Sequence, residues 1–189
     1  LPQLPFYLAG VTIWNYFAQT LTSTSTVFTA NAAIFGKVYF PRLTMPLSIV
    51  VSNLIRFGIQ FALFLGVWAY YLVTQNSLHP NLYILLTPIL LILMGLLSLG
   101  LGMIFSALTT KYRDLAMLLT FGVQLLMYAT PVIYPLSQLP LKYKSIILAN
   151  PLSSIVETFR YAFLGSGSFS WSYLGYSAVA TLVILVVGT

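Results

Sequence analysis

The sequence predicts an all-α polytopic membrane protein, and its composition provides the main observations. Of its 189 residues, 59% are hydrophobic and 5% are charged, whereas about a quarter of the residues in ordinary soluble domains are charged. Residues 57–110 contain no Lys, Arg, Asp or Glu, and at roughly 20 residues per crossing this run is long enough to cross a bilayer twice. The runs are continuously apolar and do not alternate, which favours helices over a transmembrane β-barrel.

The same composition excludes several kinds of chemistry. The chain has no cysteine and one histidine, His79, so we expect no disulfide and no metal site. Its only acids, Asp114 and Glu157, are expected on opposite sides of the membrane, and it has no phosphate-binding glycine loop. We therefore expect no catalytic residues and no cofactor in this chain. The net charge of +6 comes from a few cations at the ends of spans, which does not indicate a nucleic-acid partner.

We expect one transmembrane domain, residues 1–189, with five spans. Their expected ranges are about 6–33, 46–74, 83–108, 115–133 and 171–189. The first span is rich in Thr and Ser, whose hydroxyls can bond to carbonyls of their own helix.

The loops between the spans set the expected orientation. Residues 34–45 and 109–114 together carry Lys37, Arg42, Lys111 and Arg113, which places both loops in the cytoplasm by the positive-inside rule. Lys142 and Lys144 follow the fourth span on the opposite side and weaken this argument without reversing it. The chain then begins outside. We therefore expect one upstream span and six spans in the complete protein, with both termini inside.

Residues 134–167 should form a re-entrant or interfacial region on the outer face. Four prolines fall between residues 131 and 151, which a continuous helix would not accept. Asn150 and Pro151 are residue types preferred at the N-cap and at the first position of a helix. Gly165 is suited to the end of this helix, which at about 14 residues is too short to span a membrane. We expect Glu157 and Arg160 to pair on the surface of this helix at the outer mouth, with a role in gating as the alternative.

Three further groups are candidates for function. Asn53, Arg56 and Gln60 share one face of the second span. An arginine within a span indicates a functional site, unless it extends to the interface or pairs with a carbonyl. Trp14, Tyr16 and Phe17 could stack on sugars along a conduit, although aromatic residues on a helix more often serve packing. Ser98, Gly102 and Ser106 form a small-residue face that favours packing within the chain over a dimer contact.

Four motifs occur along the chain in a characteristic order and spacing. They are Lys37-Val-Tyr-Phe-Pro-Arg42 followed by Pro46-Leu-Ser, then Leu108-Thr-Thr-Lys-Tyr-Arg-Asp114, Ala129-Thr-Pro-Val-Ile-Tyr-Pro135, and Asn150-Pro-Leu followed by Glu157-x-Phe-Arg160. With these motifs the chain resembles, over nearly its whole length, the ABC-2 type permeases that export lipid-linked O-antigen, teichoic acid and related polysaccharides.

The resemblance implies a type V exporter-like fold in the bacterial cytoplasmic (inner) membrane, surrounded by membrane lipid. It implies a homodimer of six-span subunits and two copies of a separate ABC ATPase subunit, which bind ATP and Mg²⁺. The family's amphipathic N-terminal helix and first span are absent from this sequence. The coupling segment to the ATPase would consist of Lys37, Val38, Tyr39, Phe40, Pro41 and Arg42. A second cytoplasmic loop with Lys111, Arg113 and Asp114 would lie near the same ATPase face.

The implied mechanism starts with ATP-driven closure of the ATPase dimer. Closure would push on the coupling segments and part the spans, so that a lipid-linked polysaccharide passes along a hydroxyl-rich, aromatic conduit. The first alternative is an ABC-2 exporter of a drug, lipid or peptide. An ion-coupled secondary transporter is less favoured because no carboxylate falls within a clear span. A membrane-embedded glycosyltransferase would need acids or metal ligands at one membrane face.

Overall fold

The computed structural model describes residues 3–35, 41, 43–75, 78–136 and 140–189, and throughout these ranges regular structure is helical. The α-helices and one 3₁₀-helix (η1) are, in order, α1 (Gln3–Ser25), α2 (Val27–Ala30), α3 (Ala32–Phe35), α4 (Thr44–Gln75), η1 (Leu82–Leu86), α5 (Thr87–Lys111), α6 (Leu115–Ala129), α7 (Leu141–Leu148), α8 (Pro151–Leu164) and α9 (Trp171–Gly188).

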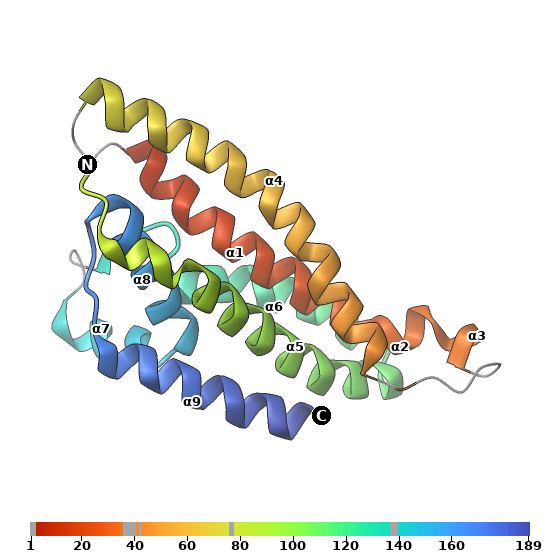
Figure 1. Cartoon of the computed structure of the whole chain (residues 1–189). Helices are drawn as coiled ribbons and strands as arrows, with labels where there is room; N and C mark the ends of the chain where they lie inside the picture. Colours follow the sequence, from red (N-terminus) through yellow and green to blue (C-terminus); the bar gives the residue numbers. More distant parts are fainter. Residues whose placement is uncertain (1–2, 36–40, 42, 76–77, 137–139) are drawn as a thin grey trace.

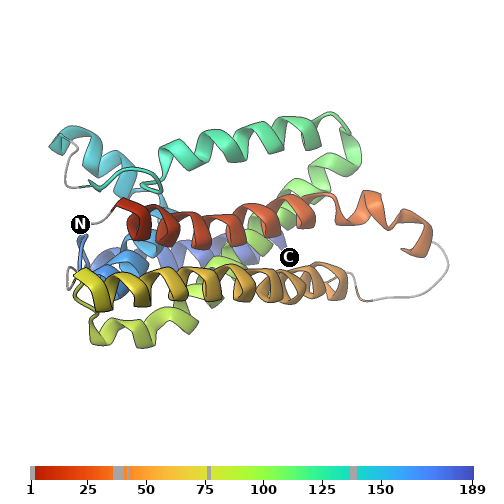
Figure 2. The same cartoon turned by 90° about the horizontal axis from the view of Figure 1, so that it is seen from above.

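The long helices run up and down beside one another, with α1 in the middle (Figure 1). α4 lies antiparallel to α1, α5 packs against both α1 and α9, and α6 lies on the far side of α1 from α4 (Figure 2). The short helices α7 and α8 gather at the end where the chain begins, whereas α2 and α3 lie at the other end (Figure 1). We refer to these as the outer and inner ends, following the orientation expected from the loops.

Three helical segments are long and apolar enough to cross a bilayer: Thr44–Thr74, Leu82–Lys111 and Trp171–Gly188. The ranges expected for these spans agree closely with the helices. The fourth expected span is shorter than predicted, because α6 is an apolar helix of 15 residues and is therefore only about 22 Å long. It ends at Ala129, immediately before Thr130 and Pro131.

The first expected span, 6–33, is wrong at its inner end because α1 stops at Ser25. The hydroxyls of Ser25 and Thr26 donate to the carbonyl of Thr22, at 2.7 and 3.4 Å. Such bonds compete with the helical backbone pattern. The carbonyl of Ser25 accepts instead from the hydroxyl of Thr109 on α5, at 2.6 Å. The chain therefore continues as two separate one-turn helices, α2 and α3.

Small residues let α5 approach its neighbours closely. A Cβ added at Gly100 would lie 2.9 Å from the backbone of Leu185 on α9, and one added at Gly102 would lie 2.6 Å from Thr24 on α1. Ser98 and Ser106 are buried on the same helix. The prediction that this face serves packing within the chain is confirmed.

At the outer end, α4 and α8 are joined through an aromatic cluster. Phe64 and Phe163 meet edge to face with their centroids 5.4 Å apart, and Phe159 lies 4.9 Å from Phe163. The indole N–H of Trp68 donates to the carbonyl of Phe163 at 2.8 Å. Because Phe64, Phe159 and Phe163 are buried, this cluster fixes α8 firmly against a spanning helix.

We predict that Gly100→Ala destabilises the protein, because the added methyl group meets the backbone of α9, which cannot move aside as a side chain can. Overpacking of this kind costs about 1–3 kcal/mol. Gly66→Ala on α4 is the matched control, since a Cβ there would meet nothing within 4 Å. Thermal unfolding in detergent should show a lower Tm for Gly100→Ala and no loss for Gly66→Ala. Equal Tm values for the two variants would contradict the close packing of α5 against α9.

Candidate functional site

A polar groove of about 640 Å³ is lined by residues of α1, α4 and α6. Figure 2 shows the arrangement, with α1 between the other two helices. Most of the lining side chains are amides or hydroxyls, and none is charged: Asn15, Ala18, Gln19, Thr22, Ser23, Gln60, Thr120, Val123 and Gln124. The groove therefore offers hydrogen bonds to a ligand without any fixed charge.

Helical spacing explains why these residues meet. Asn15, Gln19 and Thr22 follow one another at intervals of four and three on α1, and Thr120 and Gln124 are four apart on α6, so each set occupies one helix face. The hydroxyls of the first span are evident from the sequence, but the groove was not predicted. The signal in the sequence is the repeat of amides and hydroxyls at helical spacing within two apolar segments, although their pairing across more than 100 residues requires the fold.

The predicted polar stripe on α4 does not form one site. Asn53 is buried and its amide donates to the hydroxyl of Thr20 at 3.2 Å, whereas Gln60 lines the groove. Arg56 lies between them on the helix and is exposed, and it makes no hydrogen bond or ion pair with another described residue. A functional role for Arg56 stays a prediction.

The three aromatic residues expected to line a conduit lie inside the bundle. Trp14, Tyr16 and Phe17 are at most 3% exposed. Tyr16 meets Phe57 of α4 edge to face, with centroids 5.6 Å apart. The groove is lined instead by the polar residues beside them on α1, and a conduit role for the three aromatics stays a prediction.

At the inner end, α2 and α3 adjoin the corner between α5 and α6. A cavity of about 520 Å³ lies between these elements and is lined by residues that include Thr29, Thr110 and Arg113. Lys111, Arg113 and Asp114 are all exposed there. Of the predicted coupling segment, Pro41 is exposed, while Lys37, Val38, Tyr39, Phe40 and Arg42 lie outside the described residues.

At the outer end, α8 has the boundaries predicted from the sequence. The side chain of Asn150 accepts from the backbone N–H of Leu152, and Gly165 ends the helix at φ 68°. However, the expectation that Glu157 and Arg160 lie on the helix surface is wrong, because they are 2% and 0% exposed. The segment after α6 and the start of α1 pack over them, and a sequence pattern does not reveal this cover.

Arg160 connects three parts of the outer end. Its guanidinium donates to the carbonyls of Pro131 and Val132 in the turn after α6. Its charged carbon lies 3.9 Å from the ring centroid of Phe6 on α1, and its Nη1 lies 3.6 Å from Oε1 of Glu157. The planar fork of Arg suits two neighbouring carbonyls.

Burial changes the proton affinity of both charged groups on α8, which at 14 residues is too short to span. Desolvation lowers the pKa of Arg160 to about 10, against the opposing effect of Glu157, so the guanidinium remains charged at neutral pH. Desolvation raises the pKa of Glu157, while Arg160, the Ser168 backbone N–H and Lys144 act in the opposite direction.

We predict that Arg160→Met destabilises the outer end by about 3–5 kcal/mol, because it leaves a buried carboxylate and two carbonyls without their partner. Arg160→Lys should recover only part of this loss, since an ammonium cannot reproduce the planar fork. Arg113→Met, at an exposed position, is the control and should change stability by less than about 0.5 kcal/mol. Denaturant unfolding in detergent measures all three, and an Arg160→Met variant as stable as the control would contradict this account.

Comparison with known proteins identifies the family of this chain. The family model described as ABC-2 type transporter matches residues 2–164. An "O-antigen export system permease protein RfbA" of Klebsiella pneumoniae is 30% identical over 183 residues, which cover 97% of this chain and 69% of the relative. A "Polysialic acid transport protein KpsM" of Escherichia coli is 28% identical over 187 residues, with the same two coverages.

A more distant similarity is to an "Inner membrane transport permease YadH" of Escherichia coli (strain K12), 27% identical over 128 residues and 64% of this chain. The family model covers well over half of the sequence, and the O-antigen permease aligns with nearly all of it. This chain belongs to the ABC-2 type transporter family.

Proposed function

We propose that this chain is the membrane-spanning permease subunit of an ABC exporter that moves a lipid-linked polysaccharide across the bacterial cytoplasmic membrane. The proposed substrates are polysaccharides of the O-antigen, capsule or teichoic acid class. The names of its relatives support this substrate class, and the observation that carries it is the uncharged polar groove between α1, α4 and α6.

The groove matches the chemistry of a glycan. Sugar hydroxyls both donate and accept hydrogen bonds, as do the amides of Gln19, Gln60 and Gln124. Exposed to lipid, these amides would lose their hydrogen bonds to water, at a cost of several kcal/mol for each unsatisfied group. A polar occupant or a second copy of the chain removes this cost. The groove therefore supports a conduit completed by a homodimer, and it favours a glycan over a purely apolar lipid or drug.

The inner end is proposed as the face that binds the ATPase, in two copies for each permease dimer. Arg113 lines a cavity beside α2 and α3, and Lys111 and Asp114 are exposed nearby. In this proposal ATP and Mg²⁺ bind to the partner subunit, and the segment 36–42 transmits its closure. In this proposal α1 and α6 cross the membrane alongside α4, α5 and α9, which gives five spans in this chain.

We predict that Thr120→Trp blocks export, because the indole projects into the groove where the glycan passes. Thr74→Trp is the matched control: both threonines are exposed and donate to the carbonyl four residues earlier, but Thr74 is at the outer end of α4. Surface glycan on a permease-deleted strain complemented with each variant should fall by about tenfold or more for Thr120→Trp, a loss equal to about 1.4 kcal/mol of barrier. Full export with Thr120→Trp would contradict the assignment of the groove.

We predict that Tyr39→Ala with Phe40→Ala weakens the association with the ATPase, because aromatic residues carry much of the energy of protein interfaces. The control is Tyr70→Ala with Tyr71→Ala, an adjacent aromatic pair near the opposite end of α4. After purification of the full-length permease from native membranes, an ATPase should accompany the parent and the control, but not the Tyr39/Phe40 variant. Retention by that variant would mean that the docking site lies elsewhere, and absence of any ATPase would overturn the proposed ATPase partner.

A further inference from the structure

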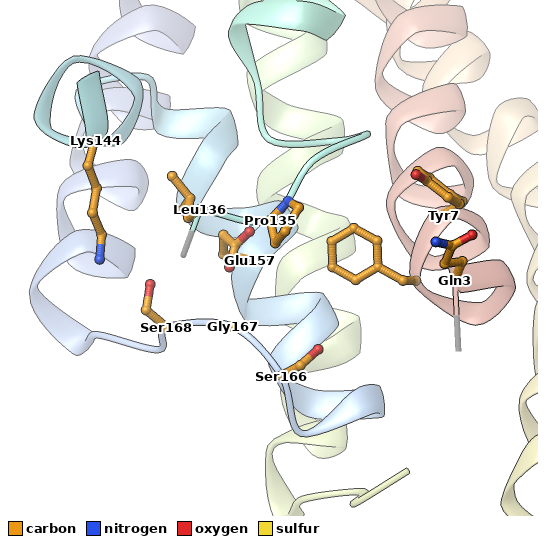
Figure 3. A pocket seen from close by; sticks show the side chains of 10 residues that line it. Gln3, Tyr7, Pro135, Leu136, Lys144, Glu157, Ser166, Gly167 and Ser168 are labelled. Atoms are coloured by element: carbon orange, nitrogen blue, oxygen red, sulfur yellow. The ribbon is translucent and has the colours of Figure 1, made fainter. Parts of the chain in front are cut away.

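The outer end contains a second cavity, of about 490 Å³, that shares no lining residue with the groove. This volume lies within the range of small-ligand sites, about 300–1,000 Å³. Figure 3 shows Gln3 and Tyr7 of α1 on one side, Lys144 of α7 and Ser168 on the other, and Glu157 between them. The cavity thus lies between the start of α1 and the short helices α7 and α8.

Polar groups at this cavity keep unused hydrogen-bonding capacity. The Oε1 atom of Glu157 is buried and accepts no hydrogen bond, and the hydroxyl of Ser166 is also buried without a partner. Arg160 does not satisfy this oxygen, because its Nη1 is 3.6 Å away, beyond hydrogen-bond distance. Unsatisfied buried polar groups are costly, so a ligand that donates hydrogen bonds to them would gain binding free energy.

The backbone around Glu157 is shaped to hold this carboxylate. Gly165 and Gly167 have φ values of 68° and 121°, in the left-handed region that glycine tolerates. A Cβ at position 167 would lie 2.7 Å from Oε2 of Glu157. The chain can therefore wrap closely past the carboxylate only with glycine at this position, which leaves Glu157 in a fixed place at the cavity.

The other lining residues narrow the class of ligand. Lys144, Gln3 and Tyr7 can donate hydrogen bonds, whereas Phe6, Pro135 and Leu136 provide apolar surface. A single carboxylate disfavours an anion, and the described residues contain no group of three His, Cys, Asp or Glu that could hold a metal ion. The carboxylate and the ammonium together favour a neutral ligand with hydroxyl groups and an apolar face, which is the chemistry of a sugar ring.

We propose that this outer cavity binds a neutral sugar unit of the glycan as it leaves the transporter, with Glu157 accepting from its hydroxyls and Lys144 donating to it. The assignment rests on the proposed export of a polysaccharide. It adds a recognition site at the exit that is separate from the conduit.

Photo-crosslinking in cells of the native host, which supplies the rest of the transporter and its own lipid-linked glycan, tests this proposal. p-Benzoylphenylalanine replaces Tyr7 at the cavity or, in the matched control, Tyr173 at the outer end of α9. These tyrosines are 43% and 44% exposed. A third variant carries it in place of Gln19 in the groove. A glycan adduct is a slowly migrating permease band that collapses after periodate cleavage of vicinal diols.

We expect a periodate-sensitive adduct from Tyr7→p-benzoylphenylalanine and Gln19→p-benzoylphenylalanine, and little from the Tyr173 control. An adduct from position 19 but not from position 7, or equal adducts from positions 7 and 173, would overturn the outer site and leave the export function standing. No adduct at position 19 or position 7 would overturn both.

A second comparison uses two lysines of α7. In the Tyr7→p-benzoylphenylalanine background, Lys144→Gln should reduce the adduct by about tenfold, the factor that corresponds to the loss of one charge-assisted hydrogen bond. Lys142→Gln, at an exposed position outside the cavity, should leave the adduct unchanged. Equal adducts from the two variants would show that Lys144 does not bind the glycan and would contradict the proposed ligand contacts.

Discussion

The interior of a bilayer offers no water to polar groups, and this constraint explains why α1 lies at the centre of the fold. Its mean hydropathy is lower than that of the other long helices. Thr20 and Ser25 are fully buried. Asn53 of α4 donates to the hydroxyl of Thr20, and Thr109 of α5 donates to the carbonyl of Ser25. The neighbouring helices thus satisfy polar groups that lipid could not.

The opposite requirement applies to the face of α1 that remains open. Asn15, Gln19 and Thr22 are not packed away, and they meet the amides and hydroxyls of α4 and α6 at the groove. One helix therefore has two polar faces: the first forms hydrogen bonds with neighbouring helices, and the second lines the groove. This division accounts for a helix that is too polar to be recognised as a span by hydropathy alone.

Local signals in the sequence were sufficient for some elements and insufficient for others. Asn150, Pro151 and Gly165 determine the boundaries of α8 through capping, and the uninterrupted apolar runs determine α4 and α5. The end of α1 at Ser25 depends on a contact with Thr109, which lies 84 residues away. No local sequence pattern therefore predicts where α1 ends.

The candidate sites required the fold for the same reason. Glu157 and Arg160, three residues apart, have the spacing of a surface ion pair. They are buried because Phe6 and the turn at Pro131 cover them, and these residues are distant in sequence. The groove likewise combines Gln19, Gln60 and Gln124 from three separate helices. Sequence periodicity can identify the polar face of each helix, but it does not show which faces meet.

In the proposed function, the distribution of charge separates conduction from recognition. Among the described residues, every charged side chain except that of Arg56 lies at the inner or the outer end, and the groove has none. Hydrogen bonds from a neutral lining are individually weak against water, so a long glycan can slide along it without being held. A lining of this kind also has little power to distinguish one neutral glycan from another. In this proposal, selectivity on the outer side comes from groups with fixed geometry and charge, which Glu157 and Lys144 provide at the exit.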